Sequence, residues 1–154
     1  VDRFFARHVG FDYDRTRPVM EEFNRMVRDQ GWNKNQRRRQ FDHLRNRMVD
    51  QFNEYYGNDI DDINAWRAMC TVLGISPVPD DLQSCRSIVK KQCANIWDYV
   101  EAKRLGIEVK RFPTLKNLAR YTYKHNKVFP KEHAKAGGVL KYLLRTISVY
   151  AGRQ

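Results

Sequence analysis

The cationic side chains near the carboxyl end of the chain are the residues whose type and spacing point most directly to chemistry. Lys116, Arg120 and Lys124 follow one another at intervals of four residues, which places them on one face of a helix. Lys127 comes three residues later and continues that face. Because a row of cations neutralises phosphates and releases their counterions, this spacing predicts a surface that binds a polyanion.

Further cations flank this predicted helix on both sides. Some lie on the link that precedes it, and others repeat the interval of four on the segment that follows. If these elements pack side by side, we expect one continuous positively charged surface beyond Ala102. The residues expected to contact phosphates are Lys103, Arg104, Lys110, Arg111, Lys116, Arg120, Lys124, Lys127, Lys131 and Lys135.

A second basic group, Arg37, Arg38 and Arg39, stands near the start of another predicted helix, which begins near Asn35. Positive charge there opposes the helix dipole, so a functional reason is expected. These arginines are predicted to bind phosphates with their guanidinium forks or to act as a nuclear localisation signal. The alternative is that they pair with the acidic residues of 50–62, in a neighbouring helix or in a second molecule.

Two tyrosines, Tyr121 and Tyr123, lie within the same basic stretch. Side chains of this kind stack on the bases of a single-stranded nucleic acid. Tyrosines at such positions also serve as half-buried packing residues, with the hydroxyl group bonded to a neighbour. Both interpretations remain open at this point.

An enzymatic reading depends on His125, Glu132 and His133, which together have the groups needed for general acid–base cleavage of a phosphodiester. Their spacing matches no known catalytic constellation, so we expect them to belong to a solvated basic surface. The sequence contains no phosphate-binding glycine loop, no Gly-x-Ser-x-Gly elbow and no His-Glu-x-x-His motif. The protein is therefore predicted not to be an enzyme.

The cysteines and histidines do not predict a metal site. Cys85 and Cys93 are eight residues apart, and Cys70 belongs to a different predicted helix. Zinc sites generally use ligands in close pairs, so we predict no metal and no cofactor. An odd number of cysteines without short spacing indicates core residues in a reducing compartment.

The charge balance changes sharply along the chain. Of its 154 residues, 1–102 contain 16 basic and 16 acidic side chains, whereas 103–154 contain 13 basic and two acidic ones. The whole net charge of +11 therefore comes from the last third, which favours an anionic partner. No apolar run has the length of about 18 residues that a membrane helix needs, and no signal-peptide pattern opens the chain. We expect a soluble, intracellular, nuclear domain that is part of a longer protein, since the chain begins with Val1 and not Met.

Hydrophobic periodicity predicts helices that position these cations. After an irregular aromatic opening over 1–15, apolar residues recur at helical spacing, with glycine, proline and Asx or Thr residues at the ends. The first expected helix starts at Thr16 and Pro18 and ends at Gly31, and the third is capped by Asp61 or Asp62 and ends at Gly74. The others cover 35–57, 82–106, 114–126 and 139–147, with a further restart at Pro130 and a break or kink at Gly137 and Gly138. The link 107–113 has β-propensity, but an isolated strand has no partner, so we expect a loop. The prediction is one all-α domain of six or seven helices with short loops.

Several stretches resemble a group of fungal proteins that are themselves uncharacterised. They are Phe4-Phe5, Gly10-Phe11-Asp12-Tyr13, Glu22-Phe23-Asn24-Arg25-Met26, Gly31-Trp32, Gln51-Phe52-Asn53-Glu54-Tyr55-Tyr56-Gly57 and Lys135-Ala136-Gly137-Gly138-Val139-Leu140. The resemblance covers most of the chain and implies a compact domain of fungal type. It implies no activity, cofactor or catalytic residue.

These observations favour a non-enzymatic module that binds DNA or RNA through its basic C-terminal surface. The alternative is a protein-interaction domain. In that case the basic end and the acidic residues of 50–62 would dock an acidic partner or a second copy of the chain, or the basic end would meet an anionic lipid surface. Binding of nucleic acid at low salt, lost steeply as salt rises, separates the first hypothesis from the second.

Overall fold

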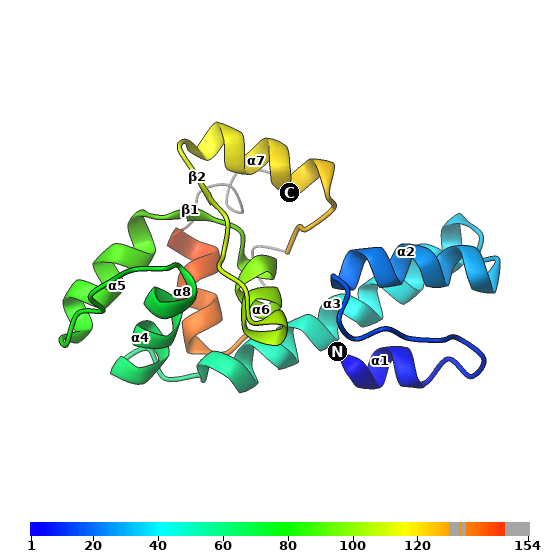
Figure 1. Cartoon of the computed structure of the whole chain (residues 1–154), viewed down its shortest axis with the longest axis horizontal. Helices are drawn as coiled ribbons and strands as arrows, with labels where there is room; N and C mark the ends of the chain where they lie inside the picture. Colours follow the sequence, from blue (N-terminus) through cyan, green and yellow to red (C-terminus); the bar gives the residue numbers. More distant parts are fainter. Residues whose placement is uncertain (130–132, 134, 147–154) are drawn as a thin grey trace.

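Eight α-helices and one two-stranded antiparallel sheet form the part of the chain that the computed structural model describes, residues 1–129, 133 and 135–146 (Figure 1). This confirms the all-α class. The helices are α1 (Asp2–Ala6), α2 (Val19–Gln30), α3 (Lys34–Tyr56), α4 (Ile63–Val72), α5 (Leu82–Lys91), α6 (Ile96–Leu105), α7 (Leu115–Lys124) and α8 (Gly138–Thr146). The strands are β1 (Cys93–Ala94) and β2 (Arg111–Phe112).

Side-chain caps start most of the helices where the sequence places an Asx or Thr residue. Thr114 accepts a hydrogen bond from a backbone amide of α7, as predicted. Of the two candidates for the cap of α4, Asp62 is the one that accepts a backbone amide. Asn33 and Gln36 form a reciprocal capping box that starts α3 one residue before the expected position. Gly31 ends α2 in the left-handed conformation, which a glycine adopts without a steric penalty.

The longest helix, α3, is the spine of the molecule (Figure 1). Its 23 residues extend about 35 Å at ~1.5 Å per residue. Toward its N-terminal end it lies beside α2, and along its length it contacts α1, α4, α6 and α8. The core is built along this spine, where the rings of Phe41 on α3 and Trp97 on α6 stack with centroids 6.0 Å apart.

The predicted single helix over 82–106 is wrong, because the chain leaves the helical conformation at Gln92 and resumes it after Asn95. Between the two helices, β1 pairs with β2, with Ala94 opposite Arg111. The link predicted as a loop therefore contains a strand, and its partner lies inside the stretch that was expected to be helical. Asn95 is fully buried and accepts a hydrogen bond from the Trp97 amide at 2.8 Å, which caps α6.

The helix α8 begins at Gly138, at the paired glycines where a break or kink is expected. This turn packs against the end of α3: the Gly137 amide donates to Asn53 Oδ1 at 3.1 Å, and Asn53 Nδ2 donates to the Lys135 carbonyl at 2.9 Å. Two stretches of the fungal resemblance therefore touch each other. The restart expected at Pro130 lies outside the described residues, as does the predicted end at 147.

Within the described ranges, no helix combines the length and the apolar character that crossing a membrane requires.

Candidate nucleic-acid interface

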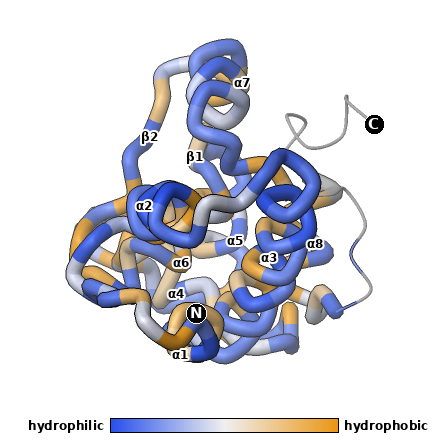
Figure 2. Tube along the Cα trace, turned by 90° about the vertical axis from the view of Figure 1, so that its right-hand side faces the viewer, coloured by the Kyte–Doolittle hydropathy of each residue, from blue (hydrophilic) through white to orange (hydrophobic). Residues whose placement is uncertain are grey.

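The helix α7 packs on the β1–β2 sheet and projects from the rest of the molecule in two views 90° apart (Figures 1 and 2). Leu118 and Thr122 form its buried side. Asn95 Nδ2 donates to Thr122 Oγ1 at 2.9 Å and to the carbonyl of Lys127 at 3.2 Å, so the residue that caps α6 also holds α7. The opposite side of α7 faces outward and carries the predicted row of cations.

Exposed cations gather on and around α7. Lys116, Arg120 and Lys124 are exposed on the helix itself, and Lys110 and Arg111 are exposed at β2. Two lysines that the sequence reasoning missed, Lys90 and Lys91, end α5 immediately before β1 and are also exposed. We call this set the α7 surface: Lys90, Lys91, Lys110, Arg111, Lys116, Arg120 and Lys124.

The α7 surface is not neutralised by carboxylates of the described chain. The ion pairs within 4.0 Å among residues 1–129, 133 and 135–146 involve none of its seven cations. Lys110 instead lies over aromatic rings, with Nζ 5.3 Å from the centroid of Phe112 and 5.7 Å from that of Tyr121. The positive charge of this surface is therefore directed to solvent.

Lys127 does not join this surface, contrary to the sequence prediction. Its Nζ donates to Asp98 Oδ1 at 2.8 Å and to the Tyr121 hydroxyl at 2.7 Å, and its side chain is only 16% exposed. Burial by itself lowers the pKa of this ammonium, but the Asp98 charge and the two hydrogen bonds raise it overall. The helix ends at Lys124, so the next cation turns inward and the helical row stops before it.

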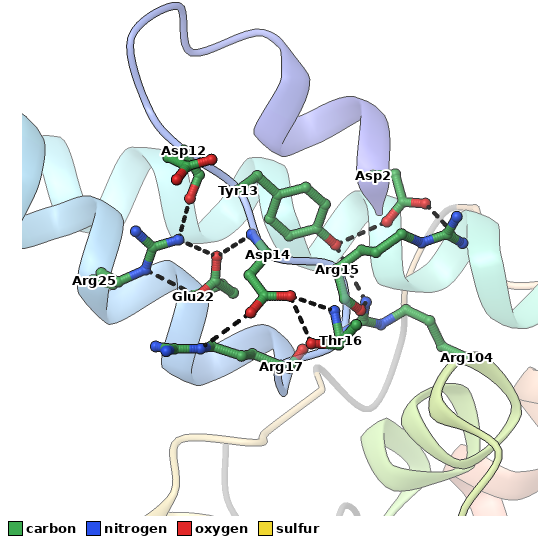
Figure 3. Close-up of polar contacts among 10 residues, drawn as sticks. All are labelled: Asp2, Asp12, Tyr13, Asp14, Arg15, Thr16, Arg17, Glu22, Arg25 and Arg104. Carbon is green, nitrogen blue, oxygen red and sulfur yellow. Dashed lines mark hydrogen bonds and ion pairs between the residues drawn. The ribbon is translucent and has the colours of Figure 1, made fainter.

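Arg104 is the second correction, because its side chain is 3% exposed. It pairs with Glu101 at 3.3 Å. It also donates to the Tyr13 hydroxyl at 3.2 Å and to the carbonyl of Arg15 at 2.7 Å (Figure 3). A further bond goes to the carbonyl of Arg17. The guanidinium group therefore holds the loop before α2 against α6 and is not accessible to a phosphate.

A similar Glu and Arg pair on α2 binds the backbone at the other end of the loop before α2. Arg25 pairs with the fully buried Glu22 at 2.6 Å and donates to the carbonyl of Asp12, while Glu22 Oε2 accepts the amide of Asp14 at 2.9 Å (Figure 3). Both helices thus carry a Glu-x-x-Arg pair with a structural role. The i,i+3 spacing of each pair is a signal in the sequence that indicates this contact.

The remaining predicted cations are dispersed. Lys103 lies toward the C-terminal end of α6, away from the sheet, beside a pocket of about 490 Å³ that Val72 and Ile107 also line. Lys135 lies beside α3, through the bond of its carbonyl to Asn53. Lys131 is outside the described residues. The single continuous cationic surface expected beyond Ala102 is therefore wrong, and the α7 surface is the part of it that the structure brings together.

The arginines at the start of α3 form a separate group. Arg37 is half-buried over the ring of Phe23, and Arg38 bonds to Asn35 Oδ1 at 3.0 Å, while Arg39 is exposed. None of the three pairs with the acidic residues of 50–62 in the ion pairs of the described chain. In that block Asp50 pairs with Arg47 and Asp61 with Arg86, at 3.5 and 3.3 Å.

The two histidines of the enzymatic hypothesis have different surroundings. His125 is exposed at the end of α7 with its ring 4.8 Å from that of Tyr121, whereas His133 Nε2 lies 2.9 Å from Asn46 Oδ1 of α3. Partial burial, and then neighbouring cations, lower the pKa of both. Glu132 lies outside the described residues.

The cysteines occupy apolar positions. Cys70 and Cys85 are fully buried where α4 meets α5, and Cys93 is partly buried on β1. Burial raises the pKa of the Cys70 thiol to about 12, so it stays protonated. In the described part of the chain no three His, Cys, Asp or Glu side chains lie close enough together to hold a metal ion.

Comparisons with protein-family models, with curated proteins and with solved structures give no match to this chain. The fungal resemblance therefore stays a prediction.

Proposed function

We propose that this protein is a non-enzymatic module that binds nucleic acid by contacting phosphates with the α7 surface. The observation that carries the proposal is a group of seven exposed cations, at α5, β2 and α7, without an ion-pair partner in the described chain. Like charges gathered in this way repel one another, and a phosphate backbone relieves that repulsion. Arg104 and Lys127, which are occupied within the molecule, are not part of the proposed site.

The proposal makes a quantitative statement about salt. If all seven cations contact phosphates, log K falls with log salt with a slope of about −5 for a single strand and about −6 for a duplex. A protein that binds through hydrogen bonds to uncharged groups has a much shallower slope. Fluorescence anisotropy with labelled 12-nucleotide DNA and RNA, from low to moderate salt, measures this slope directly.

Charge reversal on α7 is the decisive experiment. The triple variant K116E/R120E/K124E removes the central row without touching the buried face of the helix, so binding is expected to be lost at all salt concentrations. The control R3E/R7E/R28E changes the net charge equally at three exposed arginines near α1 and α2. It is expected to retain most of the affinity and the same salt slope, and circular dichroism checks that both variants stay helical. Equal losses in the two variants contradict a localised site.

The acidic residues of 50–62 give less support to the alternative, in which the basic end of one molecule binds the acidic residues of a second copy. Asp62 caps α4, Asp50 pairs with Arg47, and Asp61 pairs with Arg86, so local structure accounts for these three. Light scattering over a range of protein and salt concentrations tests self-association. A dimer that dissociates in salt and competes with nucleic acid favours this second function.

A further inference from the structure

The exposed side of α7 carries two adjacent rows of different chemistry. One row, at intervals of four residues, is cationic: Lys116, Arg120 and Lys124. The other, displaced by one residue, is Leu115, Ala119 and Tyr123. Because positions three residues apart are also neighbours on a helix, Tyr123 lies next to Arg120, and Ala119 next to Lys116. An apolar and aromatic row therefore runs along the cationic one.

The two large side chains of the second row are exposed, and Ala119 between them is partly buried. Leu115 is 45% exposed and Tyr123 38% exposed, and they are two of the four large hydrophobic residues that are exposed in the described chain. The other tyrosine of this helix has a different role. Tyr121 donates to Asp98 Oδ2 at 2.7 Å and accepts from Lys127, so its hydroxyl group helps to fix α7 against α6.

We infer that the α7 surface takes single-stranded nucleic acid, with phosphates along the cationic row and an unpaired base stacked on Tyr123. This inference rests on the proposed function and names its ligand class. In a duplex the base faces are already stacked on one another, so an apolar row on the protein has nothing to bind. In a single strand each nucleotide has a phosphate on one side and a free base face on the other, which matches the paired rows.

The dimensions and the support of the helix suit such a ligand. Each row rises by eight residue steps from end to end, about 12 Å at ~1.5 Å per residue, which limits the contact to a short run of nucleotides. The helix α7 projects from the rest of the described molecule (Figures 1 and 2). Its buried side is fixed through Thr122 and Leu118, so the rows are held in place before a strand binds.

The test compares two variants of Tyr123 on three probes of one sequence. Anisotropy is measured with a labelled 12-nucleotide strand of mixed sequence, as DNA and as RNA, and with the corresponding DNA duplex. Tyr123→Ala is expected to weaken single-strand binding by roughly 5- to 150-fold. Tyr123→Phe keeps the ring and is expected to stay within about twofold of the unmodified protein. Neither variant removes a cation, so the salt slope and the duplex affinity are expected to be unchanged.

Each other outcome overturns the inference. If Tyr123→Ala has no effect, or weakens single-strand and duplex binding equally, then phosphate contact alone explains the affinity, and the proposed function stands without a strand preference. If the unmodified protein binds the duplex more tightly than the single strand, α7 binds in a groove of the duplex and the inference is wrong. If no probe binds at low salt, the proposed function itself fails, and the charge-reversal series records that failure separately.

Discussion

Glu22 on α2 and Glu101 on α6 hold the two ends of one loop: Glu22 Oε2 accepts the amide of Asp14 at 2.9 Å, and Glu101 Oε2 accepts the amide of Val19 at 3.2 Å. Both carboxylates are buried, and each pairs with an arginine three residues later that binds carbonyls of the same loop. The loop backbone, which water would normally satisfy, is therefore bound from both sides by side chains of helices.

The two glutamates are predicted to have opposite effects on stability as pH changes. Burial raises the pKa of Glu101 above its ordinary value of 4.5, and the nearby Arg104 charge only partly offsets this. For Glu22 burial acts in the same direction, but Arg25 and the Asp14 amide outweigh it, so the pKa falls below 4.5. Glu101 thus contributes stability that is present below pH 4.5 and is lost as pH rises through its folded-state pKa. The contribution of Glu22 is present above pH 4.5 and is lost as pH falls through its folded-state pKa.

Denaturant unfolding of Glu22→Gln and Glu101→Gln between pH 3.5 and 7.5 measures this difference. The stability advantage of the unmodified protein over Glu22→Gln should shrink as the pH falls below 4.5. Its advantage over Glu101→Gln should shrink as the pH rises above 4.5. Neither difference should change by more than about 1.4 kcal/mol per pH unit, the limit for one proton. Parallel curves for the two variants would contradict the opposite assignments.

Lys127, which is buried against Asp98, is predicted to stabilise the fold, whereas the exposed Lys124 is predicted to bind nucleic acid. Asp98→Ala leaves an ammonium group that is 16% exposed without its carboxylate, so we expect a loss of about 3 kcal/mol in the free energy of unfolding. Lys127→Gln should destabilise the fold without changing the affinity of the folded protein for nucleic acid. Lys124→Gln should do the reverse, and urea titrations combined with anisotropy measure both quantities. Loss of affinity in Lys127→Gln under conditions where it is folded would return this residue to the binding surface.

The helices were predictable where an amphipathic stripe met a local end signal, as at Gly31, Asp62 and Thr114. The split of the predicted helix at Gln92 could not be predicted from periodicity. Apolar residues on both sides of the break keep a helical spacing, with Val89 followed by Cys93 and Ile96. The signal against one helix was Asn95, a residue that favours the N-cap position. The strand pairing of β1 with β2 joins residues far apart in sequence, and periodicity carries no information about such a partner.

The candidate site, like the fold, could be predicted from the sequence only in part. The row on α7 was predictable because intervals of four residues report the shared face of any helix. The sequence could not show which cations lack an ion-pair partner, because this depends on carboxylates that packing brings close. Asp98, for example, is 29 residues from Lys127 in the chain. Arg104 is the exception, because its partner Glu101 stands three residues before it.

The paired glycines at the start of α8 give a prediction about packing. A Cβ at Gly138 would overlap the backbone carbonyl of Asn58, which cannot move without shifting the end of α3. A Cβ at Gly137 would instead meet side-chain atoms of Asn58 and Asn53, whose displacement costs less than a shift of the backbone. Gly138→Ala is therefore expected to destabilise the fold by about 1–3 kcal/mol, and Gly137→Ala by less. Thermal unfolding of the two variants gives the order, and the reverse order would contradict this account of the turn.

The arginines at the start of α3 provide a test of how far the binding surface extends. Arg38 and Arg39 lie on α3, whereas the α7 surface is built on α5, β2 and α7, and the proposal places the phosphate contacts there. The double variant R38E/R39E is therefore expected to bind a labelled 12-nucleotide strand within about twofold of the unmodified protein, with the same salt slope. If a strand instead reaches α3, the slope falls by about 1.4 for two lost contacts to a single strand. Repeating the titration with a 30-nucleotide strand shows whether only a longer ligand reaches both groups, and a slope that falls already with the 12-nucleotide strand would contradict a site confined to α7 and its neighbours.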